Sequence, residues 1–401
     1  MEPSNRKRRV QVSPLALHVI EQIGHAARPS RSGGVAQAVA ELSWLFTKGR
    51  IRLSREYLDD PDHAAAYLGY FLPVNLSKIQ VLLDELPYET IVSEQSRMAV
   101  LDLGSGPGTG GLALLDWLHH RAVEPAGNLS VVAVDSSAGA LQQAEDIWSL
   151  YCQKAKIVGA SLKTCEGNLE RSLSGLWSRP IGQGAPYDLI ILANCLNELF
   201  TAAADPIAAR AGFVAALMPL LAPHGTMMIV EPALRDMSRD LHQVRDRLLQ
   251  EKRCTVYSPC LHERGCPALA NSDDWCHEER AWQAPAAIHA IDQEVGFIKD
   301  ALKFSYLLLR TDGRTIVRRQ PDVYRIVSEL RVLKGDTRAW LCNERGRSEI
   351  GRLDRAQCAT NAAWDDCQRG TIVRIEGLKR KEGATLGRIP AEGIIEIVRP
   401  V

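Results

Sequence analysis

The pattern of apolar and polar positions divides the chain into parts of different character. Residues 1–92 carry alanine and leucine at three- and four-residue spacing, as in LALHVIEQIGHAA and LSKIQVLLDEL, which predicts a helical region. From 93 to 317, short continuous apolar runs such as VLDLG and VVAVD alternate with helix-like stretches. Such runs are typical of parallel strands buried on both faces, and their alternation with helices predicts a doubly wound, Rossmann-like α/β sheet.

The segment 318–401 is strand-like again. Runs such as VYRIVSELRVL and TIVRIEGL are separated by glycine, and we expect no long helix there. This pattern predicts a separate small β-barrel or OB-like module. Before it, the run ALKFSYLLLR predicts a late strand that closes the Rossmann-like sheet, and the cysteine-rich segment 250–290 has no clear periodicity and is expected to be an insertion.

Composition indicates an ordinary globular protein, with 46% hydrophobic and 24% charged residues among 401. No apolar run approaches the ~20 residues that cross a bilayer, and no apolar segment follows the basic start MEPSNRKRRV, so we expect neither a membrane partner nor a secretory signal. The ten cysteines are therefore expected to bind metal or to be buried, and not to form a disulfide scaffold.

Charge is balanced overall but not along the chain. The formal net charge is zero, whereas the segment 310–401 holds 19 lysines and arginines against 13 acidic residues. An excess of this kind suits a polyanionic partner, and a solvated basic surface explains it equally well.

The stretch MAVLDLGSGPGTGG predicts a cofactor loop. A strand leads to Asp102, and Gly104, Gly106 and Gly108 follow, where the backbone must turn sharply and approach a ligand without a Cβ in the way. A nicotinamide fingerprint fits poorly, since its third glycine position falls on Thr109. The spacing resembles the glycine loop of class I methyltransferases, which implies S-adenosylmethionine as the cofactor.

Further residues extend this candidate site. Asp135 ends the next strand, where its carboxylate can accept both ribose hydroxyls; Gly167 and Asn168 are expected to flank the adenine, and Asn194 to lie near the sulfonium. The predicted cofactor-binding residues are Asp102, Gly104, Ser105, Gly106, Gly108, Asp135, Ser136, Gly167, Asn168 and Asn194.

Polar residues after the fourth and fifth apolar runs are candidates for catalysis. They are Asn194, Asn197, Glu198 and Glu231, which follow strand ends, where ligands bind in open α/β sheets. Positioning of the acceptor supplies most of the catalysis in methyl transfer, and a group that accepts a proton adds to it. Each of the four can equally be a helix cap. Cys195 is expected to be a small buried residue, because a cytosine-C5 methyltransferase nucleophile would follow proline and not asparagine.

Cys254, Cys260, Cys266 and Cys276 are grouped as C-x5-C-x5-C-x9-C and predict a metal site. The spacing lacks the C-x2-C pairs of zinc fingers, but four-cysteine sites also hold iron–sulfur clusters, so zinc and iron–sulfur both stay open. His262 and His277 can replace a ligand, support one or contact RNA. The other cysteines (Cys152, Cys165, Cys342, Cys358, Cys367) show no grouping and are expected to be incidental.

Several motifs in a fixed order resemble one known family. LSREYLDDPDHAAAYLGYFLP, VLDLGSGPGTG, LNEL, VEP, C…PC-x-H…CP…WCH and KFSYLLL span roughly 50–310 and are similar to the mitochondrial small-ribosomal-subunit methyltransferase-like proteins and their bacterial relatives. The resemblance implies a role with the small ribosomal subunit or its rRNA. It also implies a [4Fe-4S] cluster on the four grouped cysteines. Ala233, where the family often has glycine, departs from the pattern and bears on the substrate.

Three functions are consistent with this sequence. The first is an S-adenosylmethionine-dependent rRNA methyltransferase with a [4Fe-4S] cluster. The second is a non-catalytic assembly factor of the small subunit that binds the cofactor, and the third is a small-molecule or protein methyltransferase with structural zinc. We expect a cytoplasmic location in a bacterium and a mitochondrial one in a eukaryote. The sequence predicts neither the acceptor atom nor an oligomeric state.

Overall fold

The computed structural model describes residues 9–26, 34–52, 57–87, 90, 97–121, 128–171, 181, 184–380 and 386–401. The basic stretch at the start of the chain and residues 53–56 of the first family motif lie outside these ranges. None of the helices in the described ranges is long and apolar enough to cross a membrane.

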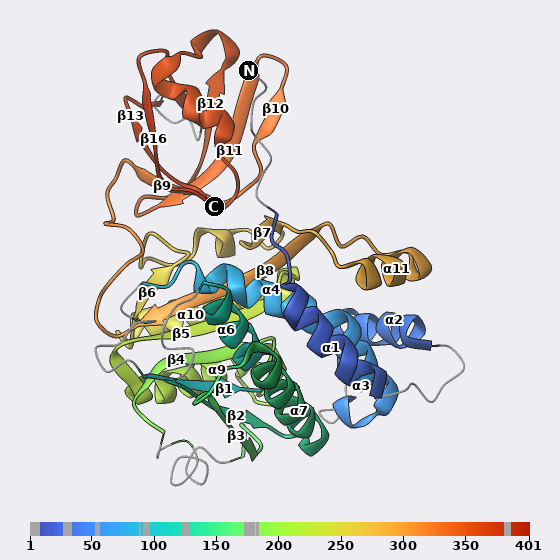
Figure 1. The fold of residues 1–401 in the computed structure, drawn as a ribbon. Coiled ribbons are helices and arrows are strands. Elements are labelled where there is room, and N and C mark those ends of the chain that lie inside the picture. The colour runs from blue at the N-terminus through green and yellow to red at the C-terminus, as the bar shows by residue number, and fades with distance from the viewer. Residues whose placement is uncertain are drawn as a thin grey trace.

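An eight-stranded sheet forms the centre of the molecule, with the order β3-β2-β1-β4-β5-β8-β6 and with β7 paired to β8 (Figure 1). Its parallel strands are β1 (Met98–Leu103), β2 (Leu129–Asp135), β3 (Ser161–Glu166), β4 (Tyr187–Ala193) and β5 (Leu221–Pro232). The long strand β8 (Ala301–Arg310) is antiparallel to β5, β6 (Thr255–Ser258) and β7 (Glu278–Ala281). This is the predicted Rossmann-like sheet, closed by the predicted late strand.

Helices cover both faces of this sheet. One face carries α1 (Pro14–Ala26), α2 (Gly34–Thr47), α4 (Leu72–Leu83), α6 (Thr109–His120) and α7 (Ala138–Ala155). The other carries α9 (Pro206–Leu217) and α10 (Arg235–Gln250). Successive strand residues point to opposite faces, so Val100 of β1 joins the first core and Leu101 the second. Continuous apolar runs therefore become strands buried on both faces, as predicted.

Short elements complete the N-terminal region between α2 and α4. They are the 3-10 turns Arg50–Arg52 (η1) and Tyr57–Asp59 (η2), helix α3 (Pro61–Ala66) and the π-helical turn Tyr67–Phe71 (η3). Asp60 caps α3 by accepting from the backbone N–H groups of Asp62 and His63 at 2.9 and 3.2 Å. The 3-10 turns Leu196–Glu198 (η5) and Met218–Leu220 (η6) lie on either side of α9.

The cysteine-rich segment has more structure than its sequence predicts. It contains β6, the 3-10 turn Pro267–Ala270 (η7) and β7, and it is followed by α11 (Ala286–Val295). Both strands are four residues long and gain their partner, β8, from later in the chain. A strand that short carries too few alternating positions to be recognised from its own pattern.

A second eight-stranded sheet follows, in the order β14-β15-β12-β11-β9-β13-β16 with β10 paired to β11, and lies beside β7 in Figure 1. Its strands are β9 (Val323–Ile326), β10 (Arg331–Leu333), β11 (Asp336–Asn343), β12 (Gly346–Leu353), β13 (Ile372–Glu376), β14 (Lys379–Arg380), β15 (Leu386–Ile389) and β16 (Ile394–Arg399). The turns Asp354–Ala356 (η8) and Ala359–Asp366 (η9) connect β12 to β13, and Trp364 of η9 fills the core. The C-terminal part is thus a β-sheet module, as predicted.

A buried group of charges joins the two sheets. Arg325 of β9 donates through Nη2 to Glu85 Oε1 and to Glu278 Oε2, each at 3.0 Å. The same nitrogen lies 2.7 Å from the Tyr306 hydroxyl. Burial raises the pKa of Glu85, but the attraction of Arg325 and Arg280 outweighs this and lowers it to about 2. The module is therefore held to the Rossmann-like part by ionised side chains in a water-poor interface.

Candidate cofactor site and cysteine cavity

The glycine loop between β1 and α6 is shaped by its neighbours. Gly104, Gly106 and Gly108 have φ values of 65°, 51° and 77°, which L side chains rarely adopt. A Cβ on Gly104 would lie 2.5 Å from Cys195 Cβ, and one on Gly108 would lie 2.9 Å from Ala144 Cβ. The loop consequently packs against β4's turn on one side and α7 on the other, which only glycine permits.

Asp102 lies buried beneath this loop and contacts the start of α6. It is 1% exposed and accepts from the backbone N–H of Gly111 at 3.1 Å, and burial raises its pKa to about 7. Asp102 was predicted to bind the cofactor, but it is not among the residues that line the cavity described next. Its carboxyl group orients the start of α6.

Asp135, at the end of β2, faces the loop. Its Oδ2 accepts from Gly106 N at 2.8 Å and its Oδ1 from Ser137 N at 3.0 Å. Burial raises the pKa of Asp135, and these backbone N–H groups oppose the shift. Ser137 in turn donates to Asp59 of η2 at 2.5 Å, so the N-terminal region is bound to this corner of the site.

A cavity of about 410 Å³ opens at the carboxyl ends of these strands. This volume lies in the range of small-molecule sites. Of the predicted cofactor residues, the cavity is lined by Gly104, Gly106, Asp135, Ser136, Gly167, Asn168 and Asn194. Ser105 and Gly108, like Asp102, are not among its lining residues. Ser105 is buried, with 3% of its surface exposed, and Gly108 packs against Ala144 of α7.

The turn after β4 carries three of the four predicted catalytic residues. Asn194, Asn197 and Glu198 line the cavity, and Asn194 has a φ of 58°. A non-glycine residue in this region stores strain, which is common at functional sites. Cys195 is buried and donates to Leu103 O at 3.2 Å, in agreement with the expectation of a small buried residue.

Glu231, the fourth predicted catalytic residue, lies behind the turn. It is 1% exposed and does not line the cavity. Its carboxylate accepts from the backbone N–H of Asn197 at 3.1 Å and from the Asn197 side chain, and burial raises its pKa to about 7. Arg210 donates to Asn197 O at 2.8 Å. Glu231 and Asn197 therefore hold the shape of the turn.

Residues from the N-terminal region also line the cavity, and the sequence did not single them out. They include Arg50, Tyr57, Tyr67, Phe71, Asn75 and Lys78. Arg50 donates to Asn197 O at 3.1 Å, which joins η1 to the turn after β4. The only local signal in the sequence was the three- and four-residue spacing from Tyr67 through Phe71 and Asn75 to Lys78. The same spacing is found in an ordinary helix that faces a core.

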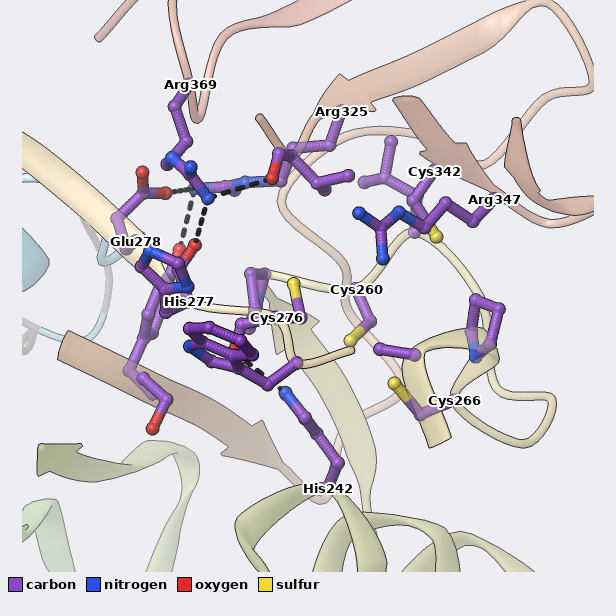
Figure 2. Close-up of a pocket in the computed structure, with 18 of the residues that line it drawn as sticks. His242, Cys260, Cys266, Cys276, His277, Glu278, Arg325, Cys342, Arg347 and Arg369 are labelled. Atoms are coloured by element: carbon purple, nitrogen blue, oxygen red, sulfur yellow. Dashed lines mark hydrogen bonds and ion pairs between the residues drawn. The ribbon is translucent and has the colours of Figure 1, made fainter. Parts of the chain in front are cut away.

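A second cavity, of about 40 Å³, lies between the cysteine-rich segment and the C-terminal sheet. Cys260, Cys266 and Cys276 face it together with Cys342 of β11 (Figure 2). All four thiols line this cavity, and each of the other three raises the pKa of Cys342 after the larger effect of burial.

Of the four grouped cysteines, Cys254 does not line this cavity. It directly precedes β6, whereas Cys260 follows the other end of that strand. Cys342, expected to be incidental, lines the cavity instead, because β11 pairs with β9 and β12 in the sheet that forms one wall of it.

Cationic and neutral side chains surround the thiols together with one acidic residue, Glu278. The side chain of Arg245 is 0% exposed. Burial lowers the pKa of Arg245, but the attraction of Cys260, Asp246 and Cys266 outweighs burial, and the net effect is a raised pKa. Burial raises the pKa of Cys276 to about 11. Burial also lowers the pKa of His242, His262 and His277 to about 4, so these rings are neutral near pH 7. His242 Nε2 lies 3.0 Å from Cys276 O. In the part of the chain that the structure describes, no three His, Cys, Asp or Glu side chains are placed to hold a single metal ion.

The fold is that of a Rossmann-like class I methyltransferase. It is defined by the strand order of the first sheet with its antiparallel β8, and by the glycine loop that faces Asp135 at the end of β2. The family model of the mitochondrial small ribosomal subunit protein Rsm22 matches residues 61–368, and the chain belongs to this family.

Solved structures with a similar fold are distant from this chain. An O-methyltransferase family protein from Burkholderia thailandensis is 15% identical, over 70% of this chain and 72% of that one, with a TM-score of 0.34. A putative class I S-adenosylmethionine-dependent methyltransferase from Listeria monocytogenes is 12% identical, over 75% and 81%, with a TM-score of 0.36. Because the scores lie below 0.5, the fold class rests on the strand order. No curated protein sequence matches the chain.

Proposed function

We propose that the larger cavity binds S-adenosylmethionine and that the protein is a methyltransferase acting on, or together with, the rRNA of the small ribosomal subunit. The observation that carries this proposal is the convergence of Gly104, Gly106, Asp135 and Asn194 on one cavity of about 410 Å³. These residues come from three strand ends, where open α/β sheets bind their ligands.

The residues present fit the cofactor. Asp135 keeps lone pairs for the two ribose hydroxyls beside its two backbone partners. Gly104 and Gly106 leave room for the methionine part, and Gly167 and Asn168 flank the adenine position. The cofactor supplies an activated methyl group, and Asn194 and Glu198 orient the acceptor beside it, since both line the cavity. Asn197 and Glu231 act by holding this turn.

Family membership supports the ribosomal partner. The description of the matching family names the mitochondrial small ribosomal subunit, which favours rRNA over a small molecule or a free protein and the mitochondrial location over the cytoplasm. The excess of basic residues after Arg310 is consistent with a polyanionic partner.

We also propose that Cys260, Cys266, Cys276 and Cys342 hold a [4Fe-4S] cluster. Four thiols around one cavity are the donor set of such a cluster, and buried Arg245 offsets the charge of thiolates. A single zinc ion needs four donors within about 2.3 Å of one point. In a [4Fe-4S] cluster each thiolate binds a different iron, so the four thiols lie further apart than they would around a single zinc ion.

Anaerobic purification tests the cluster. We expect brown protein with broad visible absorption, containing iron and acid-labile sulfide. Cys342→Ser should lose most of the iron, whereas the matched variant Cys254→Ser should retain it. Stoichiometric zinc in colourless protein, or iron loss in Cys254→Ser alone, would contradict the proposed ligand set.

Labelled methyl transfer tests the activity. Protein incubated with S-adenosylmethionine carrying a labelled methyl group and with small-subunit particles should label the rRNA, and Asp135→Asn should label it less. Protein that associates with the particles and binds the cofactor but labels nothing is the non-catalytic assembly factor, and this outcome would refute methyl transfer.

A further inference from the structure

The larger cavity extends past the predicted cofactor residues. Its near half, on the side of the glycine loop, is bounded by Gly106 after β1, Asp135 at the end of β2 and Asn168 after β3. Its far half is bounded by Pro232 at the end of β5 and by Lys303 in β8. In the sheet order, β4 lies between these two sides. A cofactor held at the glycine loop with its methyl group near Asn194 therefore leaves the far half open.

One helical face forms a wall along both halves. Tyr67, Phe71, Asn75 and Lys78 line the cavity at intervals of three and four residues through η3 and α4, and Val74 lines it beside Asn75. The segment begins as a π-helical turn, a form found frequently at functional sites.

This wall runs from the cofactor loop to the far half. Burial raises the pKa of Tyr67 to about 12, against the lowering effects of Asn75 and of Thr109, the first residue of α6. At the other end, burial and the neighbouring Lys299 lower the pKa of Lys78 to about 7, against the effect of Glu231 at the end of β5. Helix α4, which carries Lys78, packs against β8, the strand that carries Lys303 of the far half.

The wall offers aromatic surface and in-plane hydrogen bonding. Phe71 lies 5.1 Å from Phe46 and 6.0 Å from Tyr67 between ring centroids. Beside it, Lys78 Nζ donates to Asn75 Oδ1 at 3.0 Å, and Asn75 Nδ2 donates to the Tyr67 hydroxyl at 3.4 Å. Asn75 and Lys78 retain further donor and acceptor positions for a ligand. A flat ring with polar edges fits such a wall.

The charge of the cavity favours an anionic chain at its mouth. Its basic lining residues are Arg50, Lys299 and Lys303, together with Lys78, which is only partly protonated near pH 7, and its acidic ones are Asp135 and Glu198. Lys303 is exposed, with its side chain 56% accessible, and its ion pair with Glu279 is an open surface contact of 3.4 Å. Phosphates are attracted by such lysines.

We propose that the far half of this cavity is the methyl-acceptor pocket and that it takes one base of single-stranded RNA, with the ring against Phe71, the edge at Asn75 and Lys78, and the neighbouring phosphates at Lys299 and Lys303. The inference rests on the proposed function and adds the acceptor class. A peptide side chain is the competing occupant, and it uses neither the flat wall nor the cationic mouth.

Photo-cross-linking of the full-length protein tests the pocket. A single-stranded oligouridine hexamer with one thiouridine is irradiated with the protein in the presence of S-adenosylhomocysteine. We expect the cross-linked tryptic peptide to be the one that ends at Lys78. Phe71→Leu and Lys78→Met should each reduce the yield at least about fivefold, as loss of one stacked or hydrogen-bonded base contact implies. Lys154→Met, at an exposed lysine of α7, is the matched control.

Binding of S-adenosylhomocysteine, measured by calorimetry on the same variants, separates the two proposals. Unchanged binding with reduced cross-linking supports the acceptor pocket and shows that the variants are folded. If the variants bind S-adenosylhomocysteine and cross-link to RNA as the wild type does, the acceptor pocket is overturned. Cross-links found only in the C-terminal sheet overturn it as well. Transfer of labelled methyl groups to a ribosomal protein and not to RNA also overturns it. Absence of binding in the wild-type protein overturns the proposed function itself.

Discussion

Two aspartates beside the same glycine loop do different things. Asp135 faces the cavity, whereas Asp102 is buried beneath the loop and accepts from Gly111 N. Both lie at the carboxyl end of a strand, Asp102 in β1 and Asp135 in β2, so the sequence places them at the same edge of the sheet without separating their roles. The distinction depends on which side of the loop each carboxylate occupies, and this is set by tertiary packing against α6.

Gly104 provides a test at the scale of one residue. Gly104→Ala places a Cβ 2.5 Å from Cys195 Cβ at a φ of 65°. We expect the free energy of unfolding to fall by about 1–3 kcal/mol, from overpacking together with backbone strain, measured by urea denaturation.

The matched control is Gly212→Ala, on an exposed position of α9 with nothing within 4 Å of the added Cβ. It should raise the free energy of unfolding by about 0.4–1 kcal/mol. Equal effects of the two substitutions would mean that the loop does not pack as described.

Among the elements, local sequence predicts those that carry their own pattern. The strands β1, β2, β4 and β5, the glycine loop and Asp135 were all predicted, because each lies in a continuous apolar run or directly after one. Cys342 was missed because it joins Cys276 only through the pairing of β11 with its neighbours. Lys78 was missed because a cavity-lining face and a core-facing face have the same spacing. The boundaries 1–92, 93–317 and 318–401 stay a prediction.

The turn after β4 is testable at the scale of an element. Asn197→Ala removes the side-chain donor to Glu231 and leaves a buried carboxyl oxygen without that partner. We expect the free energy of unfolding to fall by about 1–3 kcal/mol. Urea denaturation measures the effect, and cofactor affinity should fall with it because Asn194 and Glu198 belong to the same turn. A substitution that is neutral in both measurements would contradict the positioning role.

At the scale of the whole molecule, the buried charges between the two sheets hold the module in place. Glu85 is 8% exposed and contacts Arg325 at 3.0 Å. Glu85→Gln leaves Arg325 with one charged partner fewer, and we expect a loss of about 3–5 kcal/mol near pH 7, as for other broken buried pairs.

This loss should depend on pH. The pKa of Glu85 is lowered from its ordinary 4.5 to about 2 in the folded protein, so the ionised form contributes stability above pH 4.5 and this contribution disappears as pH falls toward 2. Urea denaturation at pH 7 and pH 3 should therefore show the difference between wild type and Glu85→Gln narrowing in acid. Glu21→Gln, at an exposed position of α1, should show little difference at either pH. A constant difference would contradict the account.

Calorimetric titration of the wild-type protein with S-adenosylmethionine tests the central claim most directly. We predict saturable binding at one site per chain, at least about tenfold weaker in Asp135→Asn, which loses charge-assisted hydrogen bonds to the ribose. Binding should be unchanged in Asp146→Asn, at an exposed aspartate of α7. No binding by the wild-type protein, or equal affinity in wild type and Asp135→Asn, would contradict the assignment of this cavity as the cofactor site.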